Sequence, residues 1–433
     1  MKQWQPFSWQ QHNTKQLFSY PNHQAYQATL LQLRSLPPLL NLTSIKQLHH
    51  LLAKAALGDY FLIQGGDCAE RFIDCHAESI KERTKALLHC SLLLSQHLKK
   101  PVIKVGRIAG QYAKSRSAAM EHKTSMSLPS YFGDLINRPF FTHKDRTPHP
   151  KYLLQAYRCT HWTLSFLHEQ GKHHFADLYR PHCWQPNCLE NYQDKHDFVE
   201  TIEAINEALT SNAENNNLKT TLQLPLFTSH EALHLAYEES LTHQDPLTGK
   251  WYNFGTHLPW IGMRTSKPDS AHIEYIRGIY NPVAVKIGPD INPDELCELI
   301  ERLNPHNDPG RLTLIHRLGS NRVHEHLPKL ISAAKRTGKI VLWVCDPMHG
   351  NIKQDEQGNK VRYFDDIRDE LHASIDIHQA NGSHLGGVHL EMTGENIYEC
   401  VGGSSKPSCQ PRRPTVDPRL NYAQSLELCL GLN

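Results

Sequence analysis

Four cationic side chains could bind an anion together, because each stands at or just after the end of a short apolar run. They are Arg107, Arg264, Lys286 and Arg317. Arginine binds planar carboxylates and phosphates through paired hydrogen bonds, and lysine adds a point charge. Cations that converge on one place repel one another unless an anion neutralises them. The pattern therefore predicts a small, multiply anionic ligand, and a phosphorylated one fits best.

A second group of residues after apolar runs could bind a metal ion. Cys68, His349, Glu391 and a carboxylate later in the chain would combine a thiolate, an imidazole and oxygen ligands. Sites made only of oxygen suit Mg²⁺ or Ca²⁺, whereas a thiolate favours Mn²⁺, Fe²⁺, Co²⁺ or Zn²⁺. These residues are far apart in sequence, and a cysteine after a strand is commonly an inert packed thiol. Both interpretations of Cys68 remain open on these grounds.

The segment HCWQPNC offers a competing metal site. It contains His182, Cys183 and Cys188, and His173 and His174 precede it. Structural zinc modules usually show two C-x₂₋₄-C pairs, or one such pair with a paired histidine motif at finger spacing. Neither second half is present here, so we do not expect zinc at this segment.

The elements that must position these side chains are predicted by recurring apolar runs. The runs are short and rich in β-branched residues, and each ends in glycine, proline or a charged residue, as buried strands do. We expect strands at residues 61–64, 102–105, 222–226, 260–262, 283–287, 312–315, 340–344 and 388–390. Helix-like segments such as PDELCELIERL and VHEHLPKLISAAKRTG separate them.

Strands that alternate with helices imply an α/β fold with a parallel sheet. With this number of units the sheet is expected to close into a (β/α)₈ TIM barrel, whose chemistry lies at the carboxyl ends of the strands. The polar residues above, together with Asp346, would then meet at one mouth. A doubly wound open sheet is the alternative, but no G-x-G-x-x-G opens the first helix.

Two regions exceed a minimal barrel. Residues 1–58 form an N-terminal extension with one expected helix, in NHQAYQATLLQLRSL, and the catalytic barrel spans residues 59–433. The connection between the second and third strands is far longer than a usual barrel loop. We expect a helical insertion there, at about residues 142–218.

Composition excludes several classes of protein. The formal net charge is only +2, which gives no reason to expect nucleic acid or an acidic membrane as a partner. No stretch approaches the ~20 apolar residues that span a bilayer, and the first residues lack the pattern of a secretory signal. The 11 cysteines are an odd number and indicate reduced thiols. We therefore expect a cytoplasmic protein.

Ten motifs resemble those of the type II, plant-like 3-deoxy-D-arabino-heptulosonate 7-phosphate (DAHP) synthases. They occur in order along nearly the whole chain: IQGGDCAERF, GRIAGQYAKSRS, YFGDLIN, TSHEAL, WIGMRT, NPVAVKIGP, LNPHNDPGRLTLIHRLG, WVCDPMHGN, GGVHLEMTGEN and DPRLNYAQSLEL. The family is a (β/α)₈ barrel. The resemblance implies a transferase that condenses phosphoenolpyruvate with erythrose 4-phosphate and releases phosphate, in the first step of the shikimate pathway.

The resemblance also implies a role for each matching position. The family's metal ligands correspond to Cys68, His349, Glu391 and Asp417, with Mn²⁺ the expected metal and Co²⁺, Fe²⁺ or Zn²⁺ as alternatives. Its phosphoenolpyruvate contacts correspond to Arg107, Met263, Arg264, Lys286 and Arg317. Its erythrose 4-phosphate contacts correspond to Lys114, Arg116, Ser117 and Asp346. The expected catalytic groups are Lys114, Asp346 and Glu391.

The sequence departs from the family pattern at several positions in these motifs. Met263 stands where the family usually has an acidic residue. The change costs little if the backbone N–H at this position contacts phosphate, whereas it puts activity in doubt if the carboxylate itself acts. Ser115 replaces a proline and loosens the KSRS segment, which we expect to raise the KM for the aldehyde.

Other functions and partners stay open on this resemblance. An amino-DAHP-type synthase of specialised metabolism would use the same chemistry on an aminated sugar phosphate, and a regulatory paralogue would have lost catalytic residues. We expect a homo-oligomer, either a dimer or a tetramer, and a weak or absent response to an aromatic amino acid effector.

Overall fold

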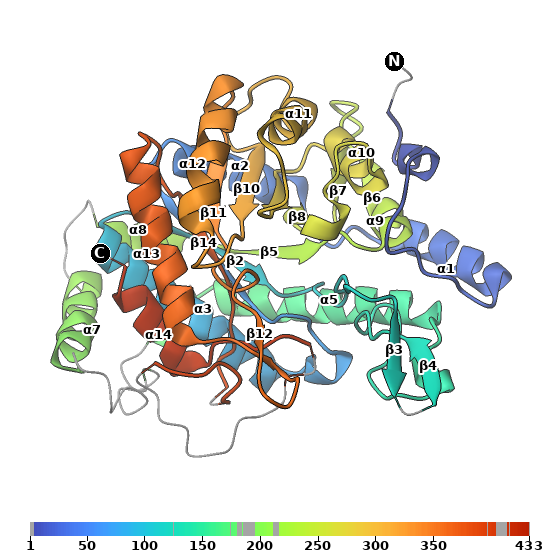
Figure 1. Ribbon diagram of the computed structural model, residues 1–433, viewed down its shortest axis with the longest axis horizontal. Helices are drawn as coiled ribbons and strands as arrows, with labels where there is room; N and C mark the ends of the chain where they lie inside the picture. The colour runs from blue at the N-terminus through green and yellow to red at the C-terminus, as the bar shows by residue number, and fades with distance from the viewer. Residues whose placement is uncertain are drawn as a thin grey trace.

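A closed parallel barrel forms the centre of the molecule. The computed structural model describes residues 4–123, 125–173, 175–179, 184, 195–210, 216–395, 397–403, 414 and 416–432. Within these residues eight strands close in the order β1-β14-β11-β10-β9-β8-β5-β2 (Figure 1). Their bounds are β1 Phe61–Gly66, β2 Val102–Arg107, β5 Leu226–Glu231, β8 Leu258–Ile261, β9 Val283–Ile287, β10 Leu312–His316, β11 Leu342–Cys345 and β14 Gly387–Glu391. The predicted (β/α)₈ barrel is confirmed.

The register of the strands brings their carboxyl ends to one mouth. Gly66 at the end of β1 pairs with Arg107 at the end of β2 on one side and with Glu391 at the end of β14 on the other. In the same way His316 at the end of β10 pairs with Cys345 at the end of β11. Residues that are hundreds of positions apart in sequence therefore reach the same end of the barrel.

The third predicted strand was placed too early. We expected residues 222–226, but β5 begins at Leu226, and Leu222 belongs to helix α8 (Asn217–Gln223). Asn216 accepts a hydrogen bond from the backbone N–H of Leu218 and so starts this helix. The run LQLPL is short and mostly apolar, and such a run fits a helix and a strand equally well, so the cap decides here.

The N-terminal extension contains two helices where one was expected. They are α1 (His23–Ser35) and α2 (Leu42–Ala56), which begin at asparagine caps. Leu48 and Leu52 of α2 pack with Leu62 and Ile103 of the first two strands and with Leu342 of β11. Helix α2 therefore covers apolar side chains of the barrel interior.

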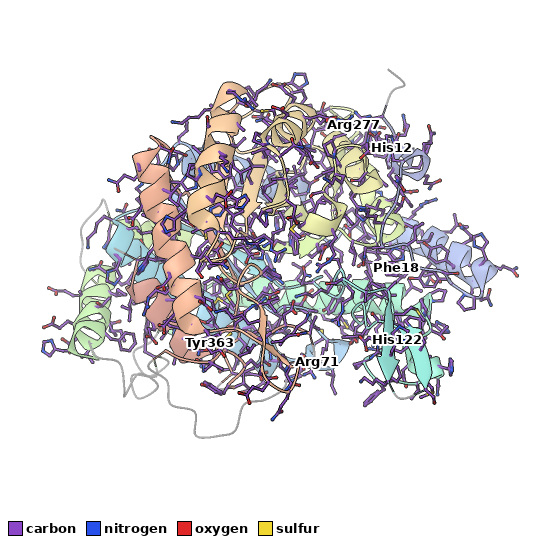
Figure 2. The ribbon with its side chains drawn as sticks, viewed as in Figure 1. His12, Phe18, Arg71, His122, Arg277 and Tyr363 are labelled. Carbon is purple, nitrogen blue, oxygen red and sulfur yellow. The ribbon has the colours of Figure 1, made fainter. Side chains whose placement is uncertain are left out.

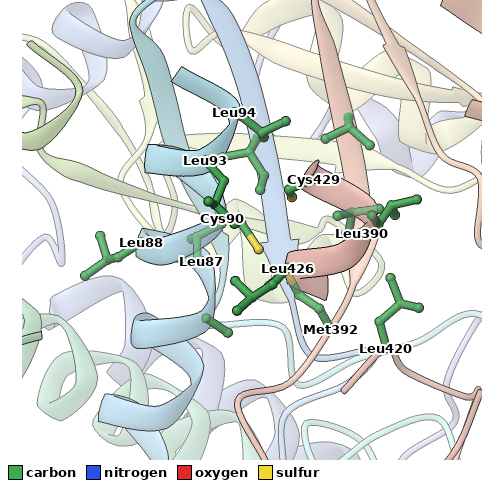
Figure 3. Close-up of a cluster of buried hydrophobic side chains, with 14 of the residues drawn as sticks. Leu87, Leu88, Cys90, Leu93, Leu94, Leu390, Met392, Leu420, Leu426 and Cys429 are labelled. Atoms are coloured by element: carbon green, nitrogen blue, oxygen red, sulfur yellow. The ribbon is translucent and has the colours of Figure 1, made fainter. Parts of the chain in front are cut away.

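Helices surround the barrel on its outer side. They are α3 Ala77–Leu98, α9 Leu235–Ser240, α10 Ala271–Gly278, α11 Pro293–Leu303, α12 Val323–Arg336, α13 Phe364–Ala380 and α14 Tyr422–Leu430. Leu87, Leu88 and Cys90 of α3 lie in one buried cluster with Leu426 and Cys429 of α14 (Figure 3). Among the described helices, none combines the length and apolar character that a membrane crossing requires.

The connection between β2 and β5 contains helices and a hairpin. The helices are α4 His143–Arg146, α5 Lys151–Gly171, α6 Ala176–Tyr179, α7 Lys195–Thr210 and α8. The hairpin pairs β3 (Met120–Lys123) with β4 (Met126–Pro129), and His122 on it lies at the edge of the molecule (Figure 2). Four further short strands form two antiparallel pairs: β6 Thr242–Gln244 pairs with β7 Trp251–Asn253, and β12 Lys353–Gln354 pairs with β13 Lys360–Val361.

Candidate active site

One cavity at the carboxyl ends of the strands collects most of the predicted site residues. Its volume is about 510 Å³, which falls in the range of small-molecule sites. Its lining includes Cys68, Arg107, Lys114, Arg116, Ser117, Met263, Arg264, Lys286, Arg317, His349 and Asp417. Asp346 and Glu391 are fully buried and bond directly to residues of this lining. The structure thus brings every residue predicted for the site to one mouth.

Cys68, Glu391 and Asp417 form a buried cluster whose ligand atoms all lie within 4.8 Å of one another. The Nε2 atom of His349 is 3.0 Å from the Oε1 atom of Glu391, so the imidazole adjoins this cluster. Burial, with the nearby charge of Glu391, raises the pKa of the Cys68 thiol to about 12. A thiol in this environment is protonated at neutral pH unless a strong cation binds its sulfur.

The donor set fits a divalent transition metal. One thiolate, one imidazole and two carboxylates match a site of mixed softness. The ammonium group of Lys114 bonds to Cys68, Glu391 and Asp417 together, so the cluster already attracts a cation to its centre. A metal ion held by these three residues would compete with Lys114 for the same atoms. Both groups cannot make these contacts at once.

Glu391 is surrounded by cations as well as by His349. Its Oε1 atom is 3.0 Å from the guanidinium of Arg107, and its Oε2 atom is 2.7 Å from that of Arg362. Despite complete burial, His349, Lys114 and Arg362 hold the pKa of Glu391 well below its usual range. Sequence reasoning missed Arg362, which follows the short strand β13 and not a barrel strand.

Lys286 and Asp346 form a buried ion pair below the cavity. The same carboxylate is 2.7 Å from Nδ1 of His349, so it also orients the imidazole. Burial lowers the pKa of Lys286 to about 8, although Asp346 opposes the shift. The indole ring of Trp260 adjoins two cations, and its centroid is 5.5 Å from the Arg107 guanidinium and 5.3 Å from Lys286 Nζ. Trp260 was predicted only as a strand residue.

The two remaining arginines reach the cavity from neighbouring loops. Arg317 donates to the backbone oxygen of His349, and its second amino group is 3.1 Å from the sulfur of Met263. Its Nε atom is buried without a hydrogen-bond partner among the described residues. Arg264 donates to the hydroxyl of Ser117 over 2.7 Å. The cations therefore retain donors that could bind an anion.

The KSRS segment is fixed by a residue of the N-terminal extension. The side-chain amide of Gln16 accepts a bond from the backbone N–H of Arg116 and donates to its carbonyl oxygen, each over 3.1 Å. Gln16 itself has a positive φ of 61°. No pattern in the sequence identified this contact, because it depends on where the extension crosses the mouth.

Most residues of the competing zinc segment lie outside the part of the chain that the structure describes. His182, Cys183 and Cys188 lie outside the described residues, as does His174. The prediction that this segment holds no zinc stays a prediction.

Comparisons with known proteins agree with the geometry. The family model of the class-II DAHP synthetase family matches residues 4–432. A phospho-2-dehydro-3-deoxyheptonate aldolase of Streptomyces coelicolor is 38% identical over 426 residues, which cover 97% of this chain and 95% of the relative. The protein of the same name from Neurospora crassa is 38% identical over 449 residues, covering 98% of this chain and 92% of the relative.

A solved structure supports the fold alone. The structure titled phospho-2-dehydro-3-deoxyheptonate aldolase from Francisella tularensis aligns with a TM-score of 0.51 and 12% sequence identity. The alignment covers 97% of each chain.

Proposed function

The chain belongs to the class-II DAHP synthetase family, and from that premise we propose that it condenses phosphoenolpyruvate with erythrose 4-phosphate to give DAHP and phosphate. One observation supports this most directly: four cations and a ligand cluster that contains the Cys68 thiol meet at the same cavity. Phosphoenolpyruvate carries a carboxylate and a phosphate, which such a group of cations would neutralise. The product would enter the shikimate pathway.

The cations would bind phosphoenolpyruvate and hold it still. Arg317 and Arg264 line the cavity, as do Lys286 and Arg107, which adjoin Trp260. Met263 lines the same wall through an apolar side chain, so any contact it makes with phosphate would come from its backbone. Holding two reactants in attack geometry can lower a barrier by up to ~7–11 kcal/mol.

Cys68, His349, Glu391 and Asp417 would hold a divalent metal, which we expect to be Mn²⁺, with Co²⁺, Fe²⁺ or Zn²⁺ as alternatives. When bound, such an ion would polarise the aldehyde carbonyl as a Lewis acid. Asp346 would keep the imidazole of His349 in place through its 2.7 Å hydrogen bond. Arg362, which is 0% exposed, would balance the charge of Glu391.

Lys114, Arg116 and Ser117 would bind erythrose 4-phosphate. Attack by C3 of phosphoenolpyruvate on the aldehyde carbon forms the new carbon–carbon bond. Water then adds at C2, and phosphate leaves as its C–O bond breaks. Lys114 lines the cavity and bonds to the ligand cluster. If its ammonium left the cluster, it could donate a proton to the new hydroxyl.

A coupled assay tests the proposed function. Loss of phosphoenolpyruvate should require erythrose 4-phosphate, stop when a chelator is added and return when Mn²⁺ or Co²⁺ is restored. An aminated sugar phosphate assayed beside it distinguishes the specialised alternative. Turnover that survives complete metal removal would contradict the metal-dependent mechanism, and turnover of the aminated sugar alone would contradict the proposed substrate.

The buried Lys286 predicts a loss of phosphoenolpyruvate binding at alkaline pH. Its pKa in the folded protein is lowered to about 8, so the ammonium is charged below this pH and neutral above it. Binding of an anion should therefore weaken as pH rises through 8 and beyond. A bound anion stabilises the charged ammonium, so the pKa of Lys286 should be higher in the complex than in the free protein. Calorimetric titration with phosphoenolpyruvate at a series of pH values measures this.

The matched variant for that titration is Lys286→Arg. Arginine keeps its charge throughout this range, so the alkaline loss of affinity should disappear even if affinity at neutral pH is lower. If this variant still lost phosphoenolpyruvate affinity at alkaline pH as the wild type does, the loss would be due to the titration of another group.

Assembly and regulation remain predictions. We expect a homo-oligomer in the cytoplasm with a weak or absent response to aromatic amino acids. Calorimetric titration that revealed a sub-millimolar tryptophan or phenylalanine site would contradict the latter.

A further inference from the structure

A buried carboxylate outside the barrel bonds to two loops of the mouth. Glu370 lies on α13, which packs beside α12 (Figure 1), and it is 0% exposed. Its Oε1 atom accepts hydrogen bonds from the backbone N–H groups of Leu318, at 2.8 Å, and Gly319, at 2.9 Å. Its Oε2 atom accepts one from the side-chain amide of Asn351, at 2.7 Å. One side chain thus holds the loop after β10 and the loop after β11.

These two loops carry Arg317, which directly precedes Leu318, and His349, which stands two residues before Asn351. The loops also touch each other. Arg317 donates to the backbone oxygen of His349, and Asn351 accepts from the backbone N–H of Ser320 over 3.0 Å. A Cβ atom on Gly350 would collide with the backbone of Gly319, so glycine is required for this approach. The positions of the arginine and the imidazole are therefore coupled.

A carboxylate is costly in this environment. Burial raises the pKa of Glu370 to about 7, while the two backbone N–H groups and the charge of Arg317 oppose the shift. A buried acid is tolerated when its oxygens are satisfied, and three N–H donors satisfy Glu370. An apolar residue would pack the same space without the cost of desolvation but could not hold either loop.

We propose that Glu370 is a positioning residue that sets Arg317 and His349 at a fixed separation by tying both of their loops to α13. The proposal rests on the proposed function, in which Arg317 binds phosphoenolpyruvate and His349 binds the metal. Glu370 touches neither ligand. It acts through Leu318 and Gly319 on one side and through Asn351 on the other.

The two carboxylate oxygens of Glu370 bond to different loops, so two substitutions at this position should have different effects. Glu370→Gln keeps one acceptor, and placing it at the two backbone N–H groups preserves two bonds of the three. The new amide nitrogen then faces the amide nitrogen of Asn351, donor against donor. Asn351 cannot turn to relieve this, because it also donates to the backbone oxygen of Pro347 over 2.8 Å. Glu370→Gln should thus disturb the His349 loop alone, whereas Glu370→Ala should disturb both loops.

Binding measurements on the full-length protein separate these effects. We expect Glu370→Gln to weaken Mn²⁺ binding about ten-fold, as loss of outer-shell partners does, with phosphoenolpyruvate affinity changed less than about two-fold. Glu370→Ala should weaken both. Calorimetry gives the two Kd values, and thermal denaturation gives the stability. Glu325→Gln, at an exposed position on α12, is the matched control and should change neither affinity.

Asn351→Ala keeps the test decisive if Glu370→Ala fails to fold. It removes the bond to Oε2 and also the acceptor of the Ser320 N–H on the other loop, so it should weaken Mn²⁺ binding at least as much as Glu370→Gln does. Unchanged Mn²⁺ affinity in both Glu370→Gln and Asn351→Ala would overturn the proposal. Equal losses of both affinities in Glu370→Gln would also overturn it. A wild-type protein that binds neither Mn²⁺ nor phosphoenolpyruvate would instead contradict the proposed function.

A competing role for Glu370 is metal ligation. Ligand atoms of His316, Cys345 and Glu370 lie within 4.8 Å of one another, and neither ring nitrogen of His316 has a hydrogen-bond partner among the described residues. The three N–H donors on Glu370 favour the positioning role. Metal analysis of Cys68→Ala decides: stoichiometric Mn²⁺ or Zn²⁺ that is retained there and lost on adding His316→Ala would overturn our proposal.

Discussion

Replacing Cys68 by alanine is expected to abolish tight Mn²⁺ binding and to lower the metal-restored rate about 10³-fold, as loss of several kcal/mol of Lewis-acid stabilisation implies. The sulfur is the one soft ligand in the cluster, and Glu391 and Asp417 are already neutralised in part by Lys114. Without the thiolate, Lys114 should keep its bonds to the two carboxylates and exclude the metal. The fold should survive, because the substitution removes one buried sulfur atom.

The measurements are Mn²⁺ affinity, by calorimetry, and the rate of phosphoenolpyruvate loss with saturating metal. Cys90→Ala is the matched control, since this thiol is equally buried but lies in the apolar cluster between α3 and α14 (Figure 3). The control should keep both properties. If Cys68→Ala bound Mn²⁺ with the affinity of the wild type, the cluster would not be the metal site.

Strand ends were the most predictable part of this molecule. Lys286 and Arg317 lie in or directly after apolar runs whose bounds were predicted within a residue, so their place at the mouth followed from the fold. Glu391 closes β14 in the same way. In a closed parallel barrel, a residue at the carboxyl end of a strand lies at the mouth whatever other residues it contacts there.

The partners of these residues could not be predicted. Arg362 pairs with Glu391 from a segment that belongs to no barrel strand, and Gln16 binds the backbone of Arg116 across 100 positions of sequence. Such contacts depend on the course of loops, which hydrophobic periodicity does not describe. Glu370 likewise lies on a helix of ordinary amphipathic pattern, and this pattern does not indicate that its side chain bonds to two loops of the mouth.

Lys114 shows a further limit of reasoning from motifs. The family resemblance assigns it to the aldehyde substrate, whereas the structure places its ammonium among the proposed metal ligands. Buried opposite charges pair when no other counter-charge is present, because each would otherwise be desolvated alone. The two positions are compatible if Lys114 leaves the cluster as the metal enters, and this would couple metal binding to the arrangement of the aldehyde site.

Glu391→Ala is expected to destabilise the metal-free protein by about 3–5 kcal/mol, the usual cost of removing one partner of a buried ion pair. Arg107 and Arg362 are 1% and 0% exposed, and both lose their only carboxylate partner among the described residues. The wild-type Glu391 has a pKa held well below its unfolded value, so its contribution is present above that value and is lost as pH falls. The difference between wild type and variant should therefore shrink in acid.

Urea denaturation in the presence of chelator measures this loss at neutral and at acid pH. Glu301→Ala is the matched control, because its pair with Lys339 lies at the surface, where such pairs contribute about 0–1 kcal/mol. A loss of stability at position 391 no larger than in this control would mean that Arg107 and Arg362 find other acceptors when the carboxylate is gone. The charge balance at the mouth would then not depend on Glu391, and the buried carboxylate would contribute to catalysis but not to stability.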